Sequence, residues 1–368
     1  MKYYGSNKVG SSYRKLAMII RPVANICIYS LLILCFCILS YKLILGDGKP
    51  SVPSMAAAST AVTEDSIKGF TVSESTVVPE EIKIDSVKVY VSSKDKVEEL
   101  PLEEYIKGVV SSEMPLNFNK EALKAQAIAA RTYTVAHVLS GSGCSNSPGA
   151  DLCDSVHCQV YTPKDVKMAQ LGGMAEARWS LVEEVVEETR GMVISYGGKV
   201  IEGAFYFSTS SGKTENVEDV FSKELPYLKS VDSEGEEVAP RYSESKNIDL
   251  NRFVTVINSN YPDAGLSPSN LQGQISIQSY TDGGCVKEIK VGNVTITGVK
   301  FRKLFGLNSA NFNLEFLSNE VVISCRGFGH GVGMSQWGAN IMAGNGSTCE
   351  EIIKHYYTGV DITKINEE

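Results

Sequence analysis

The sequence lacks an excess of positive charge. It carries 35 Lys and Arg against 43 Asp and Glu in 368 residues, a formal net charge of -8 at pH 7. A nucleic-acid binder usually shows a basic footprint, and an acidic chain also adheres poorly to anionic polymers. The Gly-rich stretch 327–333 has neither the glycine spacing of a dinucleotide fingerprint nor the Lys-Ser/Thr pair of a P-loop. We also find no internal repeats, which leaves a chain of ordinary globular composition.

The first 46 residues contain no Asp or Glu, and five Lys and Arg side chains precede an apolar run over 24–45. That run matches the ~20 residues of a spanning helix and exceeds the ~7–15 residues of a signal-peptide core. Because positive charge marks the cytoplasmic side, we expect a cytoplasmic segment over 1–23. We expect an uncleaved transmembrane anchor over 24–45 in preference to a cleaved signal peptide, with the C-terminal domain outside the cytoplasm.

Residues 46–81 are rich in Pro, Ser, Thr and Ala and predict a flexible linker. The folded part begins near residue 82, where 83–92 alternates like a strand. We predict one α+β ectodomain over 82–368, of one or two lobes, with helices early and a largely antiparallel β portion late. The expected late strands are 274–280, 285–291, 294–297, 311–317 and 320–325.

Glu113 lies between two predicted helices. Residues 102–110 form the first, and strong helix formers after Asn119 predict a long second one. Pro115 prevents easy continuation between them. We therefore expect Glu113 in a turn, where by itself it is most simply a solvated carboxylate.

A cluster of Cys153, His157 and Cys158 offers ligand types that suit tetrahedral zinc. His137 and Cys144 lie upstream, and the spacing leaves open which of them is a fourth ligand. A disulfide between two of the three cysteines is the alternative. Four ligands would make the site structural, whereas three would leave an open catalytic position.

A polar loop follows a predicted strand and contains Ser210, Ser211, Lys213 and Glu215. Ser210 and Lys213 have Ser-x-x-Lys spacing, but a catalytic pair of that kind needs its Lys one turn along a helix. Hydrogen bonding to a hydroxylated ligand suits these side chains better than nucleophilic catalysis.

Three motifs then occur in order: 113–133, 208–215 and 329–339. Together they resemble the stage II sporulation protein D family of peptidoglycan lytic transglycosylases, over about residues 83 to 360. The resemblance implies a single catalytic carboxylate at Glu113, which protonates the glycosidic oxygen and then takes the proton of the sugar's own 6-hydroxyl. A 1,6-anhydromuramoyl end is the product, so no second carboxylate is needed to activate water.

The resemblance also implies substrate-binding groups lining one cleft with Glu113. The expected residues are Arg131, Tyr133, Ser210, Ser211, Lys213, Glu215, His330 and Gln336. Some family members carry zinc on a Cys/His cluster, for which we assign His137, Cys153, His157 and Cys158. The implied role is degradation of septal peptidoglycan during forespore engulfment, on peptide-stripped glycan strands, with a partner amidase and a membrane scaffold protein. The alternatives are a zinc-dependent peptidoglycan hydrolase and a non-catalytic wall-binding activator of an amidase.

Overall fold

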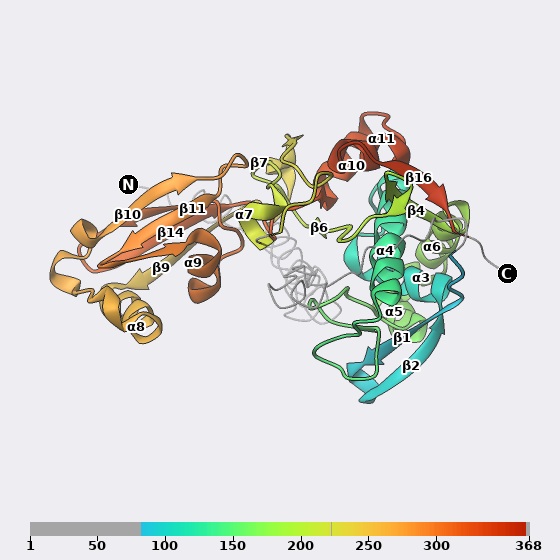
Figure 1. Ribbon diagram of the computed structural model, residues 1–368, viewed down its shortest axis with the longest axis horizontal. Helices are drawn as coiled ribbons and strands as arrows, with labels where there is room; N and C mark the ends of the chain where they lie inside the picture. Colours follow the sequence, from blue (N-terminus) through green and yellow to red (C-terminus); the bar gives the residue numbers. More distant parts are fainter. Residues whose placement is uncertain (1–81, 222, 366–368) are drawn as a thin grey trace, which may run out of the picture. The chain divides into compact units, whose positions relative to one another are not determined.

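The computed structural model describes residues 82–221 and 223–365 (Figure 1). The predicted cytoplasmic segment, anchor and linker lie outside these residues. Within the described part, no helix is both long and apolar enough to cross a membrane. Helices and mostly antiparallel sheets alternate along the chain, so the α+β prediction is confirmed.

The described residues form two hydrophobic cores. The first core is built by residues that precede and follow the second one along the chain. Its helices are α3 (Leu102–Glu113), α4 (Lys120–Ser140), α5 (Lys164–Leu171), α6 (Ala175–Glu188), α7 (Val217–Phe221), α10 (Gln336–Gly344) and α11 (Cys349–Tyr356). Its strands are β1 (Ser86–Val91), β2 (Lys96–Pro101), β3 (Leu152–Cys153), β4 (Met192–Tyr196), β5 (Lys199–Val200), β6 (Tyr206–Phe207), β7 (Gly212–Lys213), β8 (Asp232–Ser233), β15 (Met334–Ser335) and β16 (Asp361–Lys364).

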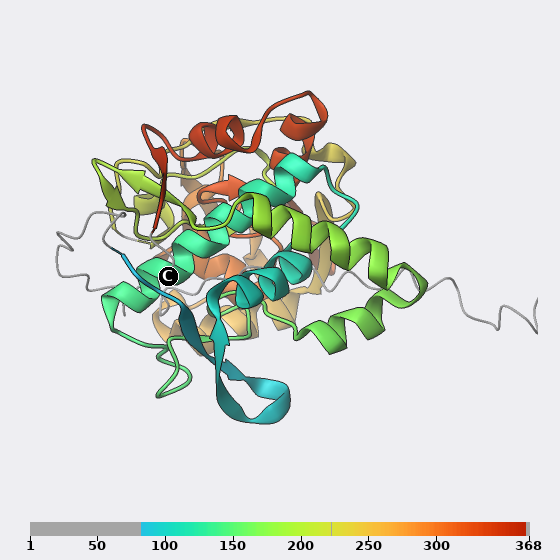
Figure 2. The same cartoon turned by 90° about the vertical axis from the view of Figure 1, so that its right-hand side faces the viewer.

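Helix α4 is the centre of the first core. It contacts α3, α6, α10 and α11, which surround it in Figure 2. Its residues are buried almost all round, from Ala122 to His137, as expected for a helix enclosed by other elements. Asn119 occupies the N-cap position as predicted, although its side chain makes no capping hydrogen bond.

The second core is inserted between β8 and β15. It contains β9 (Ser243–Asp249), α8 (Leu250–Asn260), β10 (Ile275–Tyr280), β11 (Val286–Val291), β12 (Val294–Thr297), α9 (Gly298–Phe305), β13 (Phe312–Phe316) and β14 (Glu320–Arg326). Its two antiparallel sheets have the orders β10-β11-β12 and β13-β14-β9. After β14 the Gly-rich segment 327–333 returns the chain to the first core, where β15 pairs in parallel with β6.

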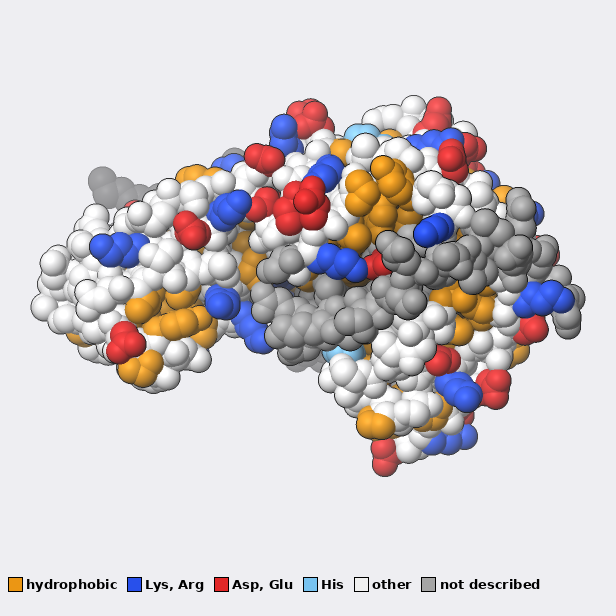
Figure 3. All heavy atoms as spheres, in the orientation of Figure 1, with side chains coloured by type: hydrophobic (Ala, Val, Ile, Leu, Met, Phe, Trp, Pro, Cys, Tyr) orange, Lys and Arg blue, Asp and Glu red, His pale blue; other side chains and the backbone are white. Residues whose placement is uncertain are grey.

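The surface carries charges of both signs. On the face shown in Figure 3, acidic and basic side chains of the described residues are interspersed. This face therefore lacks the one-sign field that would steer a polyanion to it, as the composition predicts.

Candidate active site and metal centre

Glu113 is the last residue of α3 and only 5% exposed. Its Oε1 accepts a hydrogen bond from the Val160 backbone N–H at 2.8 Å, and its Oε2 accepts one from Gln336 Nε2 at 3.4 Å. The prediction of a carboxylate presented in a turn is wrong, because α3 continues through Glu113 and the chain leaves the helix at Met114. The carboxyl group is enclosed and held by two donors.

Enclosure changes the acidity of this group. Burial raises the pKa of Glu113 from 4.5 to about 8, while the hydrogen bonds from Val160 and Gln336 act in the opposite direction. Burial, and after it the nearby charge of Glu113, also raises the pKa of Tyr206 well above 10. Glu113 is therefore protonated at neutral pH, since a low-dielectric site disfavours the charged form.

Gln336 connects Glu113 to the central helix. It is the first residue of α10, and its Nε2 lies 3.4 Å from both Glu113 Oε2 and Gln126 Oε1. Gln126 Nε2 has no hydrogen-bond partner among the described residues. Turning both amides by 180° would give Gln126 Nε2 the acceptor that it lacks and would offer protonated Glu113 an acceptor as well. The pair can thus serve both protonation states of the acid.

The loop that supplies the Val160 donor is fixed by the preceding side chain. Gln159 is buried, and its Oε1 accepts a hydrogen bond from the Tyr206 hydroxyl at 2.8 Å. Its Nε2 donates to Thr134 Oγ1 at 3.0 Å and to the Tyr105 hydroxyl at 3.4 Å. Three anchored contacts at one residue leave the neighbouring Val160 N–H little freedom to turn from Glu113.

The same loop contains the Cys/His cluster. Cys144, Cys153, His157 and Cys158 are buried, and their ligand atoms all lie within 4.8 Å of one another. All three cysteines are free thiols, so the structure does not contain the alternative disulfide. Hydrogen bonds from Cys144 and Cys158 lower the pKa of the Cys153 thiol.

The cluster geometry fits a zinc ion. Zn–S bonds of ~2.3 Å and Zn–N bonds of ~2.0–2.1 Å in a tetrahedron put neighbouring ligand atoms roughly 3.5–3.8 Å apart. Cys144 Sγ lies 3.7 Å from Cys158 Sγ, and His157 Nδ1 lies 3.6, 3.8 and 3.4 Å from the sulfurs of Cys144, Cys153 and Cys158. His157 Nε2 lies 3.3 Å from Ser145 Oγ, the kind of outer contact that orients a metal-binding imidazole.

The group of side chains that could hold a metal ion contains Cys144 and not His137, which differs from the predicted ligand set. The Nδ1 atom of His137 lies 3.1 Å from the Tyr133 carbonyl oxygen, one turn back along α4. Burial lowers the pKa of His137 to about 4, so the ring is neutral. The donor set is therefore three thiols and one imidazole, a closed set of four.

Arg131 does not face a cleft, which corrects its assignment to substrate. Its side chain is fully buried and makes a paired contact with Glu103, Nε to Oε1 at 2.7 Å and Nη2 to Oε2 at 2.6 Å. Nη1 also donates to the Met192 carbonyl at 3.1 Å. Arg131 thus joins α4 to α3 and β4 and supports the core.

Tyr133 is also enclosed, at 2% exposure, which corrects its assignment to a substrate-lining position. Its ring packs on His137 with centroids 4.2 Å apart and lies 6.4 Å from the ring of Phe205. The tyrosine therefore belongs to the packing between α4 and the segment before β6.

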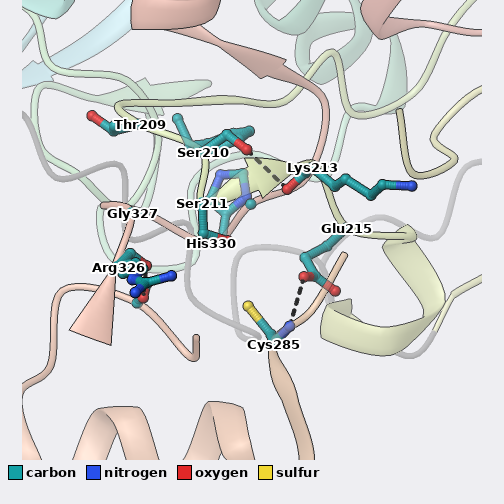
Figure 4. A pocket seen from close by; sticks show the side chains of 13 residues that line it. Thr209, Ser210, Ser211, Lys213, Glu215, Cys285, Arg326, Gly327 and His330 are labelled. Carbon is teal, nitrogen blue, oxygen red and sulfur yellow. Dashed lines mark hydrogen bonds between the residues drawn. The ribbon is translucent and has the colours of Figure 1, made fainter. Parts of the chain in front are cut away.

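The remaining expected substrate residues gather in a separate hollow (Figure 4). It is lined by Ser210, Ser211, Lys213, Glu215 and His330, so the second and third motifs do meet. Neither Glu113 nor Gln336 lines this hollow. The expected residues therefore do not share one cleft. Gln336 lies beside Glu113, and the others line the hollow.

The Ser210 hydroxyl is not arranged as a nucleophile. It donates to the Lys213 backbone carbonyl at 2.9 Å, as Figure 4 shows. The Lys213 amine instead lies 3.2 Å from Asp232 Oδ1 at an exposed position. This arrangement agrees with the preference for hydrogen bonding over covalent catalysis at this loop.

Sequence reasoning missed four side chains of these sites. Gln126 sits in an Ala-rich helix, and a polar residue at an otherwise apolar position was its one signal. Gln159 and Cys285 carry no local signal. Glu236 is buried, accepts from Ser210 N–H, Ser233 Oγ and Ser335 Oγ, and has a pKa raised by burial to about 7. Its contacts with Ser210 and Ser335 join the motif 208–215 to the motif 329–339. Both of its carboxylate oxygens accept hydrogen bonds.

Comparison with known proteins shows which proteins the chain is similar to. The family model described as stage II sporulation protein matches residues 90–196. The chain is 39% identical over 279 residues to stage II sporulation protein D of Bacillus subtilis, covering 76% of this chain and 79% of that protein. The corresponding protein of Bacillus amyloliquefaciens is 38% identical over the same shares. The amidase enhancer of Bacillus subtilis is 26% identical over 306 residues, 70% of this chain and 40% of that protein.

These matches place the chain among sporulation proteins. At the level of identity found over most of both chains, it belongs to the stage II sporulation protein D family.

Proposed function

We propose that the protein is a lytic transglycosylase that cleaves peptidoglycan glycan strands during engulfment. The observation that carries the proposal is Glu113, one enclosed carboxyl group whose pKa of about 8 keeps it protonated at neutral pH. A general acid needs its proton at the working pH, and burial is the usual way to keep it.

The reaction needs two proton transfers at one residue. Glu113 gives its proton to the glycosidic oxygen as the bond from that oxygen to the anomeric carbon breaks. The sugar's 6-hydroxyl oxygen bonds to the anomeric carbon, and its proton returns to the Glu113 carboxylate. No water enters, so the second carboxylate of a hydrolase has no task.

The two donors at Glu113 stabilise the intermediate carboxylate. Val160 N–H and Gln336 Nε2 each point at one oxygen. The acid form is favoured by burial and the anion by these donors, which keeps the two states close in free energy.

In this proposal Cys144, Cys153, His157 and Cys158 hold a zinc ion. The ion would supply charge that keeps the thiols deprotonated and would close the loop that bears Gln159 and Val160. Four protein ligands leave no open position, which disfavours the alternative of a zinc-dependent hydrolase.

The proposed location and partners follow the family. The chain would be held at the membrane by the segment over 24–45, with its C-terminal domain in the septal space. Its substrate would be peptide-stripped glycan strands, and it would work with an amidase and a membrane scaffold protein. The match to an amidase enhancer supports a second candidate, a non-catalytic module that binds the wall and activates an amidase.

One digestion separates these functions. Peptide-stripped glycan strands are incubated with the purified full-length protein, and products are analysed by mass spectrometry. We expect anhydromuramoyl ends that disappear in Glu113→Gln and persist in Glu237→Gln, an exposed carboxylate used as the control. Wall binding without products would support the activator. Release of stem peptide from intact peptidoglycan, lost in Cys158→Ser and kept in Glu113→Gln, would support the hydrolase.

A further inference from the structure

Glu236 is a buried carboxylate that has no role in the proposed proton transfers. It lies between β8 and β9 and is only 1% exposed. Its Oε1 accepts from Ser233 Oγ at 2.6 Å, and its Oε2 accepts from the Ser210 backbone N–H at 2.8 Å and from Ser335 Oγ at 2.7 Å. Burying a charged group is costly unless it is hydrogen-bonded, and here three donors from three different segments converge on one side chain.

Ser335 connects this carboxylate to helix α10. It ends β15 and is the N-cap residue of α10, so the chain turns from strand to helix at this point. Its hydroxyl donates to Glu236 and accepts from the Gly338 backbone N–H at 3.3 Å. Since the hydroxyl has one proton, giving it to Glu236 leaves lone pairs toward Gly338, as an N-cap requires. Glu236 therefore fixes the orientation of the side chain that begins α10.

Helix α10 lies directly against the carboxylate because Gly338 has no side chain. A Cβ at this position would lie 2.7 Å from Glu236 Oε1 and 2.5 Å from Ser233 Oγ, and closer still to the Tyr356 hydroxyl. Ser233 Oγ and the Tyr356 hydroxyl oxygen are themselves 2.8 Å apart, which joins α11 to the same group. The first turn of α10 thus has little room to move toward Glu236, and the contact with Ser335 prevents it from moving away.

Gln336 immediately follows this cap, and its Nε2 lies 3.4 Å from Glu113 Oε2. A hydrogen bond of this length is near the outer limit for an N–H donor, so a small displacement of α10 would break it. Glu236 acts on the residue directly before Gln336. It is therefore placed to control a donor at the acid without touching the acid itself.

We propose that Glu236 is a positioning residue for the Glu113 centre. By holding Ser335 it fixes the start of α10 and keeps the Gln336 amide against the Glu113 carboxyl group. The inference rests on the proposed function only in treating Glu113 as the reacting acid. It assigns to Glu236 an effect on that acid through contact, not through charge.

Contact and charge predict opposite changes in the acidity of Glu113. The hydrogen bond from Gln336 lowers the pKa of Glu113, so its loss should raise that pKa. Removing a negative charge should instead lower the pKa of a nearby carboxyl group. Tyr105 on α3 and Tyr206 on β6 are the titratable groups that respond to the charge of Glu113. Burial raises both of their pKa values well above 10, so both rings stay neutral while Glu113 titrates.

The titratable side chains whose charges act on or respond to that of Glu236 are Tyr356, Tyr242 and Glu237. Burial raises the pKa values of both tyrosines above their ordinary 10. Glu237 is exposed, and its charge adds to the larger effect of burial, which raises the pKa of Glu236 to about 7. Because Glu236 titrates close to Glu113, a test must assign the signal of each carboxyl group separately.

The test measures the titration of Glu113 without turnover. Infrared spectra of the full-length protein follow the protonated carboxyl band from about pH 5 to about pH 10, a range that spans the raised pKa of Glu113. Each variant is compared with the same variant carrying Glu113→Gln, and the difference reports Glu113. Glu236→Leu removes all three acceptor contacts, whereas Ser335→Ala removes the link to α10 and leaves Glu236 in place. Glu236→Gln removes the charge but keeps an oxygen for Ser210 and Ser335.

We expect the midpoint of the Glu113 titration to rise by roughly half to one pH unit in Glu236→Leu and in Ser335→Ala, the effect of losing one hydrogen bond to the charged form. Combining the two substitutions should add no further rise, because both break the same link. Glu236→Gln, and Glu237→Gln as the exposed control, should keep the wild-type midpoint. An unchanged midpoint in Ser335→Ala, or a lowered one in Glu236→Leu, would overturn the inference even if melting temperatures fall.

The role of Glu236 and the proposed function fail separately in this design. Anhydromuramoyl ends from wild-type protein, together with an unmoved midpoint in Ser335→Ala, would keep the proposed function and reject the role of Glu236. A raised midpoint in Ser335→Ala, without anhydromuramoyl ends from wild-type protein, would keep the role of Glu236 and reject the transglycosylase.

Discussion

Glu113 should make the folded protein less stable at alkaline pH. Its pKa is raised by burial from 4.5 to about 8, so the folded state keeps a proton that the unfolded chain releases between these values. Stability from this group is fully present below about pH 4.5, declines as the pH rises, and is lost above the folded-state pKa. At about 1.4 kcal/mol for each pH unit, the loss is about 3 kcal/mol at pH 7 and about 5 kcal/mol above pH 8.

The substitution Glu113→Gln removes this titration while keeping the size of the side chain. The free energy of unfolding of Glu113→Gln, relative to wild type, should therefore rise with pH from 5 to 9. Denaturant unfolding of both proteins across this range measures that difference. Since ~1 kcal/mol corresponds to about 2–4 °C in a chain of this size, melting temperatures should diverge by on the order of 10 °C.

The test depends on how the difference in unfolding free energy between Glu113→Gln and wild type changes with pH. A difference that is the same at every pH would reflect repacking of Gln126 and Gln336. A difference that stays flat from pH 5 to 9 would refute the claim that burial raises the pKa of Glu113. Glu237→Gln controls for the loss of one negative charge at an exposed position and should show no such slope.

Three further predictions follow. Arg131→Met leaves Glu103 buried without its cation and should lower the free energy of unfolding by about 3–5 kcal/mol in chemical denaturation. Metal analysis should find one zinc per chain, and chelation should lower the melting temperature; a metal-free protein with the same melting temperature would contradict the fit of the Cys/His cluster. Gln159→Met should loosen the Val160 donor that lowers the pKa of Glu113, so the alkaline limb of the pH–rate profile should move to higher pH; an unmoved limb would exclude this role.

Much of the fold follows from local patterns. Alternation predicts β1, with Val87, Val89 and Val91 all buried on one face. The Asp249 side chain caps α8, accepting from the N–H groups of Asn251 and Arg252, as a short polar residue before an apolar helical pattern does. Gly197 and Gly198 form the turn between β4 and β5, and the pairing of these strands ends after Val200.

Pairings distant in sequence could not be predicted. Strand β9 pairs with β14, more than 70 residues later, and their union makes the second core an insertion into the first. Strands β6 and β15 have two residues each, too short for any periodicity to show. Helix α9 was also missed, because the preceding β12 strand left no break before its cap at Thr297.

The site was predictable as a set of motifs but not as a geometry. The order of motifs predicts Glu113 as the acid of the proposed reaction, yet the same order placed Arg131 at the substrate. Helical spacing cannot tell that its guanidinium meets Glu103, because that contact depends on how α3 packs against α4. Similarly, His137 and Cys144 are equivalent by spacing, and only the path of the loop after α4 brings Cys144 to the cluster.

Three consecutive residues connect the two predicted centres. Cys158 belongs to the thiol–imidazole cluster, Gln159 is fixed by Tyr206 and Thr134, and Val160 donates to Glu113. The Val160 hydrogen bond lowers the pKa of Glu113 against the larger effect of burial, so the position of this backbone segment helps to set the acidity. A closed cluster is suited to that task, because four ligands hold the loop without offering a site for substrate. In the proposed reaction the cluster would therefore fix the loop beside Glu113 and would have no step of its own.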